Sequence, residues 1–247
     1  MYQWKMYDEL IENIKDDYRV ESAFVSPYWV GVKSEAGLGL AMNMNVSPAH
    51  SSLVGKMKNM KLKDLASYAK SWDFYEASLG MAAINSYYNG KNNANETSYD
   101  NLNIFDIIQD KVKGKKVTVV GHFPNIERLR EICDLSILER KVDLSPYDLP
   151  DTACEFILPE QDFLFTTAVT LINKTLPRLL ELSKKAEIYI VGPTTPLTNI
   201  MFDYGITCLS GSIVKEEEMA KDLFLEGATL HQVIKNNHIK MVNIRKP

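Results

Sequence analysis

From Lys116 onward the chain alternates between short apolar runs and helical stretches, and this alternation constrains the fold more than any other feature. The runs are rich in β-branched and aromatic residues and cover residues 116–120, 135–138, 163–166, 188–191 and 206–209. Helical patterns follow most of them. They cover residues 124–133, 196–204 and 215–225, and a further one after the third run ends near residue 183. Apolar strands that alternate with helices are typical of a parallel sheet covered on both faces. The sequence therefore predicts a doubly wound α/β domain.

The first half of the chain has a different pattern. An amphipathic helix is expected within residues 1–17, followed by β-rich segments at 19–25, 28–33 and 38–44. Short segments of this kind, separated by turn residues, favour an antiparallel meander. Two helices are expected next, at residues 62–70 and 74–88.

The Asn-rich segment 89–101 has few apolar residues and is expected to link two domains. We therefore predict an α+β domain over residues 1–95 and an α/β domain over residues 96–247. The tail is ambiguous and is expected to hold a short helix at 230–235 and an edge strand at 239–244.

Charge and cysteine content narrow the class of protein. The chain has 28 basic and 32 acidic residues, a net charge of −4, so a basic nucleic-acid-binding surface is not expected. No apolar run approaches the ~18 residues of a membrane span, and no secretory signal is visible. Three widely spaced cysteines form neither a disulfide framework nor a zinc pattern. We expect a cytoplasmic protein with no nucleic-acid or membrane partner. The sequence does not decide whether the protein forms a homo-oligomer.

Ligands of open α/β sheets bind beyond the carboxyl ends of the strands. This rule selects four predicted loops, at residues 121–125, 166–170, 192–196 and 210–212. In the third, Thr194 or Thr195 can cap a helix that begins at Pro196. The free N–H groups of such a helix could hold a phosphate or carboxylate, although the same residues also make a good start for any helix.

The first of these loops holds Gly121 and His122. One glycine does not make the G-x-G-x-x-G fingerprint of dinucleotide-binding folds. His122 could act as a general base, a hydrogen-bond donor or a ligand, or it could be structural. Glu139, which ends the second strand, could bind a ribose diol, or it could be an exposed charge.

The helix over residues 74–88 carries polar groups in apolar surroundings. Asn85 lies on its apolar face and needs partners, either nearby backbone or a ligand in a cleft between the domains. Glu76 lies off that face. Gly80 in mid-helix, and Gly37 with Gly39 in a strand, suggest close packing against other backbone.

Several chemistries lack their motifs. The sequence has no G-x-S-x-G and no G-x-x-x-x-G-K-[ST], which disfavours an α/β-hydrolase and a P-loop nucleotidase. It has no H-x-x-x-H and no C-x-x-C, so we predict no metal-ligating residues, while a metal brought in by a chelating ligand stays open.

Blocks along almost the whole chain resemble one known family. They are TTAVTLINKTL at 166–176, IVGPTTPL at 190–197, VVGHFP at 119–124, LPEQD at 158–162 and EASLGMAAIN at 76–85. They resemble the family catalogued as "Putative heavy-metal chelation". The resemblance implies an enolase N-terminal-like domain followed by a Rossmann-like domain, with a site at their junction. It implies that the protein binds, condenses or hydrolyses a pterin-, flavin- or siderophore-like compound.

Our leading hypothesis is that a small heterocyclic or anionic metabolite binds between the domains. It assigns acid–base chemistry to His122 or Glu76, and the expected ligand-binding residues are Asn85, Gly121, Phe123, Thr166, Thr170, Asn173, Gly192, Pro193 and Thr194. The alternatives are an S-adenosylmethionine-dependent methyltransferase, with Glu139 binding the cofactor, and a non-catalytic metal-chelate module. For the leading hypothesis the cofactor is unknown.

Overall fold

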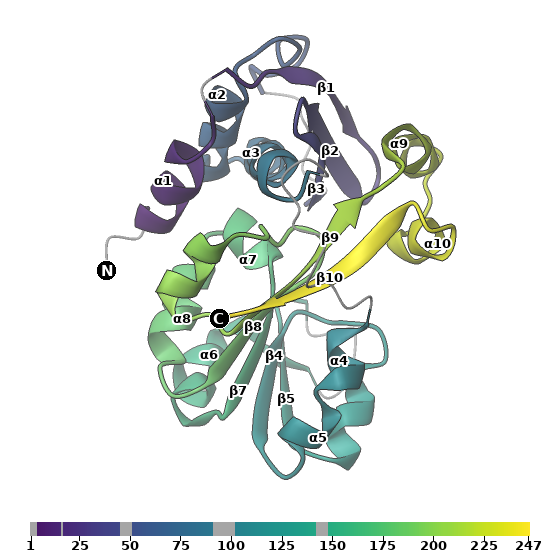
Figure 1. Cartoon of the computed structure of the whole chain (residues 1–247). Helices are drawn as coiled ribbons and strands as arrows, with labels where there is room; N and C mark the ends of the chain where they lie inside the picture. Colours follow the sequence, from purple (N-terminus) through teal and green to yellow (C-terminus); the bar gives the residue numbers. More distant parts are fainter. Residues whose placement is uncertain (1–3, 16, 45–50, 91–101, 142–147) are drawn as a thin grey trace.

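The computed structural model describes residues 4–15, 17–44, 51–90, 102–141 and 148–247. The chain forms a three-stranded antiparallel sheet and a seven-stranded sheet (Figure 1). The predicted domain boundary at residues 95 and 96 lies outside the described residues, as does most of the predicted linker 89–101.

The first half confirms the predicted meander with helices. Its elements are α1 (Lys5–Glu12), β1 (Val20–Val25), β2 (Trp29–Ser34), β3 (Gly37–Met42), α2 (Leu62–Ser67), the 3-10 helix η1 (Tyr68–Lys70) and α3 (Phe74–Tyr88). The strands pair antiparallel in the order β1-β2-β3. Helix α3 packs on β2 and β3 and is buried nearly all round, because α2 and η1 cover it from the other side.

Two glycines permit this packing, as the sequence predicts. A Cβ added at Gly39 would lie 1.9 Å from the Ser86 backbone nitrogen, and one added at Gly80 would lie 2.0 Å from the Ala69 nitrogen. Both distances are far below van der Waals contact, so α3 can approach β3 and η1 this closely only where side chains are absent.

The second half forms the larger sheet, in the order β10-β9-β8-β7-β4-β5-β6. Its strands are β4 (Lys116–Val120), β5 (Asp134–Glu139), β6 (Asp148–Pro150), β7 (Phe163–Thr167), β8 (Glu187–Val191), β9 (Cys208–Val214) and β10 (Ile239–Arg245). Neighbours from β6 to β9 pair parallel, and β10 pairs antiparallel with β9.

Helices cover both faces of this sheet, which confirms the predicted doubly wound α/β class. Figure 1 shows α4 (Ile104–Ile107) and α5 (Gln109–Val112) on one face, and α6 (Cys154–Ile157), α7 (Val169–Ile172) and α8 (Leu176–Leu182) on the other. Phe165 of β7 packs toward the first face and Leu164 toward the second, as strand alternation requires.

Short 3-10 helices fill the remaining connections. They are η3 (Ile126–Glu131), η4 (Asp151–Ala153), η5 (Leu158–Glu160) and η6 (Asn199–Tyr204). The helices expected over 124–133 and 196–204 are therefore shorter and of 3-10 type. The expected loop at residues 210–212 was also wrong: these residues lie inside β9, because β10 pairs with β9 along its whole length and extends it to Val214.

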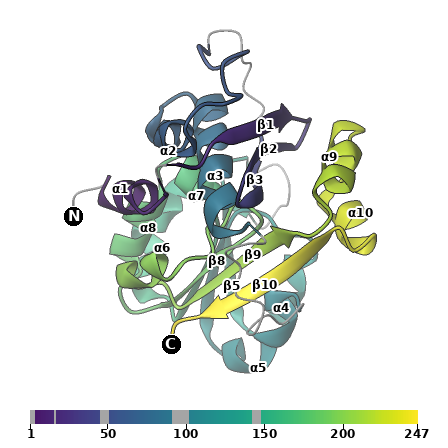
Figure 2. The same cartoon turned by 45° about the horizontal axis from the view of Figure 1, so that its top comes forward.

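The arm formed by β9 and β10 reaches the smaller sheet (Figure 2). Beside it lie α9 (Glu217–Leu225) and α10 (Leu230–Lys235). The Phe224 ring of α9 lies 6.3 Å from Phe24 and 6.1 Å from Trp29, between ring centroids. The Lys33 ammonium pairs with Glu217 and Glu218 at the same contact. Helix α9 thus covers the face of the smaller sheet that α3 leaves open.

Within the described residues, no helix is both long enough and apolar enough to span a bilayer.

Candidate functional site

The larger sheet has its topological switch point between β4 and β7. The chain leaves β4 for β5 on one side and later returns with β7 on the other. Ligands of doubly wound sheets bind beyond the carboxyl ends of the strands at such a point. Gly121 follows β4 there, with φ +97°. Gly192, with φ +110°, follows β8, which lies on the other side of β7 in the sheet. A Cβ at Gly121 would lie 2.9 Å from Thr167 Cγ2, so the chain passes close to the end of β7.

His122 lies at this edge between two carboxylates. Its Nδ1 is 3.2 Å from Asp148 Oδ2, and its Nε2 is 3.1 Å from Glu127 Oε1. The Asp148 side chain is fully buried, whereas Glu127 is 40% exposed and the imidazole 22% exposed. The imidazole is therefore fixed on its inner side and reachable on its outer side.

A neutral imidazole has one N–H, so it can donate to only one of these two carboxylates. The second contact is favourable when a further proton or another cation lies between Nε2 and Glu127. The other carboxylate oxygen of Asp148, Oδ1, is buried and has no hydrogen-bond partner in the described structure. Buried carboxylate oxygens normally have partners, so this corner can accept one more donor.

The described residues hold no group of three or more His, Cys, Asp or Glu side chains able to bind a metal ion. His122 and Glu127 form a pair of donors only. Two donors that share a metal at about 2.1 Å each lie roughly 3.0–3.4 Å apart, a range that includes their 3.1 Å separation. This pair could thus take part in an open metal site whose other ligands are not protein groups.

The predicted loop at 192–196 is placed differently from expectation. No helix begins at Pro196; the next one, η6, is capped by the Thr198 side chain, which accepts from the Ile200 N–H. Pro193 and Thr194 are buried against the first half of the chain. The Met42 N–H donates to Thr194 Oγ1 at 2.9 Å. The predicted anion-binding helix start was therefore wrong, and this loop joins the two sheets.

Asn85 contributes to the same junction. Its side chain is completely buried, and its Nδ2 donates to Leu40 O at 2.8 Å and to Thr194 O at 2.9 Å. Two roles were expected for Asn85: bonding to nearby backbone, or binding a ligand in a cleft. The structure supports the first, because the Asn85 side chain donates to backbone carbonyls.

Asn89 was not among the predicted site residues, because the sequence placed it in the predicted linker 89–101. Its Nδ2 donates to Thr195 O at 2.9 Å, and its Oδ1 accepts from the Leu197 N–H at 2.8 Å. It caps the C-terminal end of α3, one turn beyond Asn85, so helical spacing alone could have indicated it.

The polar residues after β7 bond among themselves. Thr166 and Thr170 are buried, and Thr170 Oγ1 donates to Thr167 O at 2.7 Å. Asn173 Oδ1 accepts from the Thr175 backbone N–H and hydroxyl in the turn between α7 and α8. These three predicted ligand-binding residues therefore make local hydrogen bonds, in the turn after β7 and in the turn between α7 and α8.

The remaining predicted residues are divided between two places. The Phe123 ring, beside His122, packs at a tilt of 55° against Phe105, with ring centroids 5.1 Å apart. Glu139 ends β5 and accepts from the Arg140 N–H. Glu76 accepts from the Ser51 and Ser71 hydroxyls at the start of α3. It is nine residues from Asn85, roughly 13 Å along the helix axis, so the two predicted residues of this helix do not share one site.

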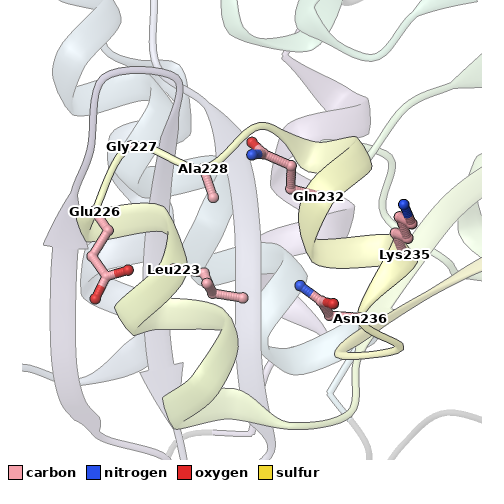
Figure 3. Close-up of a pocket in the computed structure, with 7 residues that line it drawn as sticks. All are labelled: Leu223, Glu226, Gly227, Ala228, Gln232, Lys235 and Asn236. Atoms are coloured by element: carbon pink, nitrogen blue, oxygen red, sulfur yellow. The ribbon is translucent and has the colours of Figure 1, made fainter.

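A surface cavity of about 310 Å³ lies elsewhere, between α9 and α10. It is lined by Leu223, Glu226, Gly227, Ala228, Gln232, Lys235 and Asn236 (Figure 3). It contains none of the predicted site residues, so the sheet edge at His122 is the better candidate site.

Comparison with known proteins gives the family. A family described as "Putative heavy-metal chelation" matches residues 103–243, and a second with the same description matches residues 7–88. The chain belongs to this family.

Two solved structures of the heavy-metal chelation family share the whole fold, and one sequence relative covers most of the chain. A DUF364-family protein of unknown function from Desulfitobacterium hafniense has a crystal structure that matches with a TM-score of 0.90 and 38% identity, over 99% of both chains. One from Pyrococcus horikoshii matches with a TM-score of 0.81 and 24% identity over 100% of both, which shows the fold alone. An uncharacterized protein of Methanocaldococcus jannaschii is 29% identical over 238 residues, 92% of this chain and 90% of its own.

Proposed function

We propose that this protein binds a small chelating metabolite together with its metal ion, at the carboxyl edge of β4 and β7 beside His122. The observation that carries the proposal is the imidazole held between buried Asp148 and accessible Glu127 at the switch point. A histidine whose inner nitrogen binds a carboxylate presents its outer nitrogen in a fixed direction, an arrangement common among metal-binding histidines.

The donor count favours a chelated ion over a bare one. His122 and Glu127 would supply two ligands, fewer than the three or four protein ligands that zinc sites use. The metabolite would complete the coordination shell. The family description agrees with such a ligand and does not name it.

The backbone of the edge suits a ligand that lies flat across the strand ends. A Cβ at Gly192 would meet no atom within 4 Å, so this stretch of backbone is open to approach. Gly121 and Phe123 flank the imidazole on the β4 side, and Phe123 offers an aromatic face to a heterocycle. Of the residues expected to bind ligand, Gly121, Phe123 and Gly192 keep that role in our proposal.

Binding can be tested with Zn²⁺ alone, with citrate, a catechol and nitrilotriacetate alone, and with each Zn²⁺ complex. A complex at ~100 times its Kd should stabilise the fold by about 2.7 kcal/mol, and a thermal melt detects this readily. We expect a complex to raise the melting temperature more than its two components do together. His122→Gln should abolish this excess, whereas His231→Gln, on exposed α10, should keep it. Equal shifts in wild type and His122→Gln would refute the proposal.

Proton transfer by His122 is the second candidate function. The buried Asp148 carboxylate on Nδ1 is the partner that orients a general base. Asp148→Asn would then lower turnover of a bound substrate far more than its affinity. The methyltransferase alternative stays a hypothesis, and S-adenosylmethionine in the same thermal series tests it.

A further inference from the structure

Lys174 has an unusual backbone and a partly buried amine. It follows α7 with φ +64°, a left-handed conformation that few residues other than glycine adopt. Its side chain folds back, and Nζ donates to Ile172 O at 2.6 Å. One of the three hydrogen-bonding positions of the amine is thereby used, and its direction is fixed.

The amine borders a small cavity with an aromatic wall. The cavity measures about 40 Å³ and is lined by Trp4, Tyr7, Trp72, Lys174 and Pro177. The Trp4 ring packs edge-on against Trp72, with ring centroids 5.8 Å apart, and against Tyr7 at 5.5 Å. A cavity of this size holds a few water-sized groups, enough for the functional head of a small molecule.

No carboxylate among the described residues forms an ion pair with Lys174. Two acidic residues of nearby α1 are engaged elsewhere: Asp8 pairs with Lys70, and Glu9 accepts from the Tyr204 hydroxyl. Burial without a counter-ion disfavours the ammonium form and lowers the pKa of Lys174 to about 8. About a tenth of this amine is therefore neutral, with a free electron pair, at pH 7.

We propose that Lys174 is a reactive amine that forms an imine with a small aldehyde or ketone entering this cavity. The nitrogen lone pair attacks the carbonyl carbon and forms a C–N bond. The carbonyl oxygen then leaves as water with the two amine hydrogens, and the second electron pair of the imine forms between nitrogen and carbon. Desolvated lysines in apolar pockets perform this chemistry in other proteins. The cavity shares no lining residue with the His122 site, so a failure of one proposal does not affect the other.

Reductive trapping on the full chain tests the proposal. The protein is treated briefly with acetaldehyde and cyanoborohydride at pH 7, and the ethylation of each lysine is measured by peptide mass spectrometry. An ordinary lysine, with a pKa near 10.4, has about 200-fold less neutral amine at pH 7 than one with a pKa near 8. Reduced nucleophilicity and restricted access offset part of this advantage. We expect Lys174 to react at least tenfold faster than Lys185, whose side chain is 77% exposed.

Two variants assign the effect to the cavity. Trp72→Ala removes an aromatic side chain that is itself 72% exposed, so folding should persist while water reaches the amine. The rate advantage of Lys174 should then fall several-fold, whereas Phe156→Ala, at an 85% exposed aromatic residue, should leave it unchanged. Lys174→Gly suits the left-handed backbone and should remove the fast-reacting site from a folded protein.

The proposal is overturned if Lys174 reacts no faster than Lys185 at pH 7. It is also overturned if Trp72→Ala and Phe156→Ala change the rate equally. The rate at Lys174 should level off above about pH 8.

Discussion

Replacing Asn89 with alanine should be the most damaging single polar substitution at the junction of the two sheets. Asn89 is 3% exposed, and its side chain makes three hydrogen bonds, to the Leu197 N–H, Thr195 O and Ser212 O. A buried N–H without a partner costs about 1–3 kcal/mol, and each lost donation about 0.5–1.5 kcal/mol. Asn89→Ala should therefore lower the free energy of unfolding by about 4 kcal/mol.

Urea unfolding followed by tryptophan fluorescence and by circular dichroism measures this loss. Asn13→Ala is the matched control, because Asn13 is exposed and donates once, to Glu9 O on α1. The control should lose less than about 0.5 kcal/mol. A loss below 1 kcal/mol for Asn89→Ala would refute the view that this loop serves to join the sheets, and would return Pro193 and Thr194 to the list of ligand candidates beside Gly192.

Three further changes test the packing. Gly39→Ala should prevent α3 from docking on β3 and leave little folded protein on gel filtration, because its Cβ would lie 1.9 Å from backbone. Phe224→Ala should cost about 3–5 kcal/mol in urea unfolding, since this ring is fully buried between the arm and the smaller sheet. Lys33→Gln should cost more than about 1 kcal/mol at pH 7, because Glu218 is largely exposed but Glu217 is only 9% exposed and would lose its ammonium partner. The hydrogen bond to Glu218 raises the pKa of Lys33 and lowers that of Glu218, so this cost should fade below pH 4.5 and above pH 10.5 in pH-dependent unfolding.

Local sequence patterns predicted most of the fold. The continuous β-branched run at Lys116–Val120 gave β4 with its exact bounds, and the helix Phe74–Tyr88 was likewise correct. These elements are specified by residues close in sequence. The length of β9 was not predictable in this way, because its second half is stabilised by pairing with β10, about thirty residues later.

The site was harder to predict for the same reason. The rule for parallel sheets selected the strand ends that meet at His122, but it could not tell an open loop from one covered by another sheet. Residues 193–195 are covered by α3 and β3, and the contacts of Asn85, Asn89 and Met42 reveal this. Asp148 and Glu127 were not predicted as site residues, because no local sequence pattern links either of them to His122.

Histidine side-chain nitrogen NMR tests the central claim most directly. The chain has four histidines, at positions 50, 122, 231 and 238, so each ring can be assigned with one substitution. On titration with the Zn²⁺ chelate that binds best in the thermal series, the Nε2 signal of His122 should shift first and furthest, with its Nδ1 signal still reporting a bond to Asp148. Saturable binding that leaves the His122 signals unchanged would contradict the account and place the ligand elsewhere on the molecule.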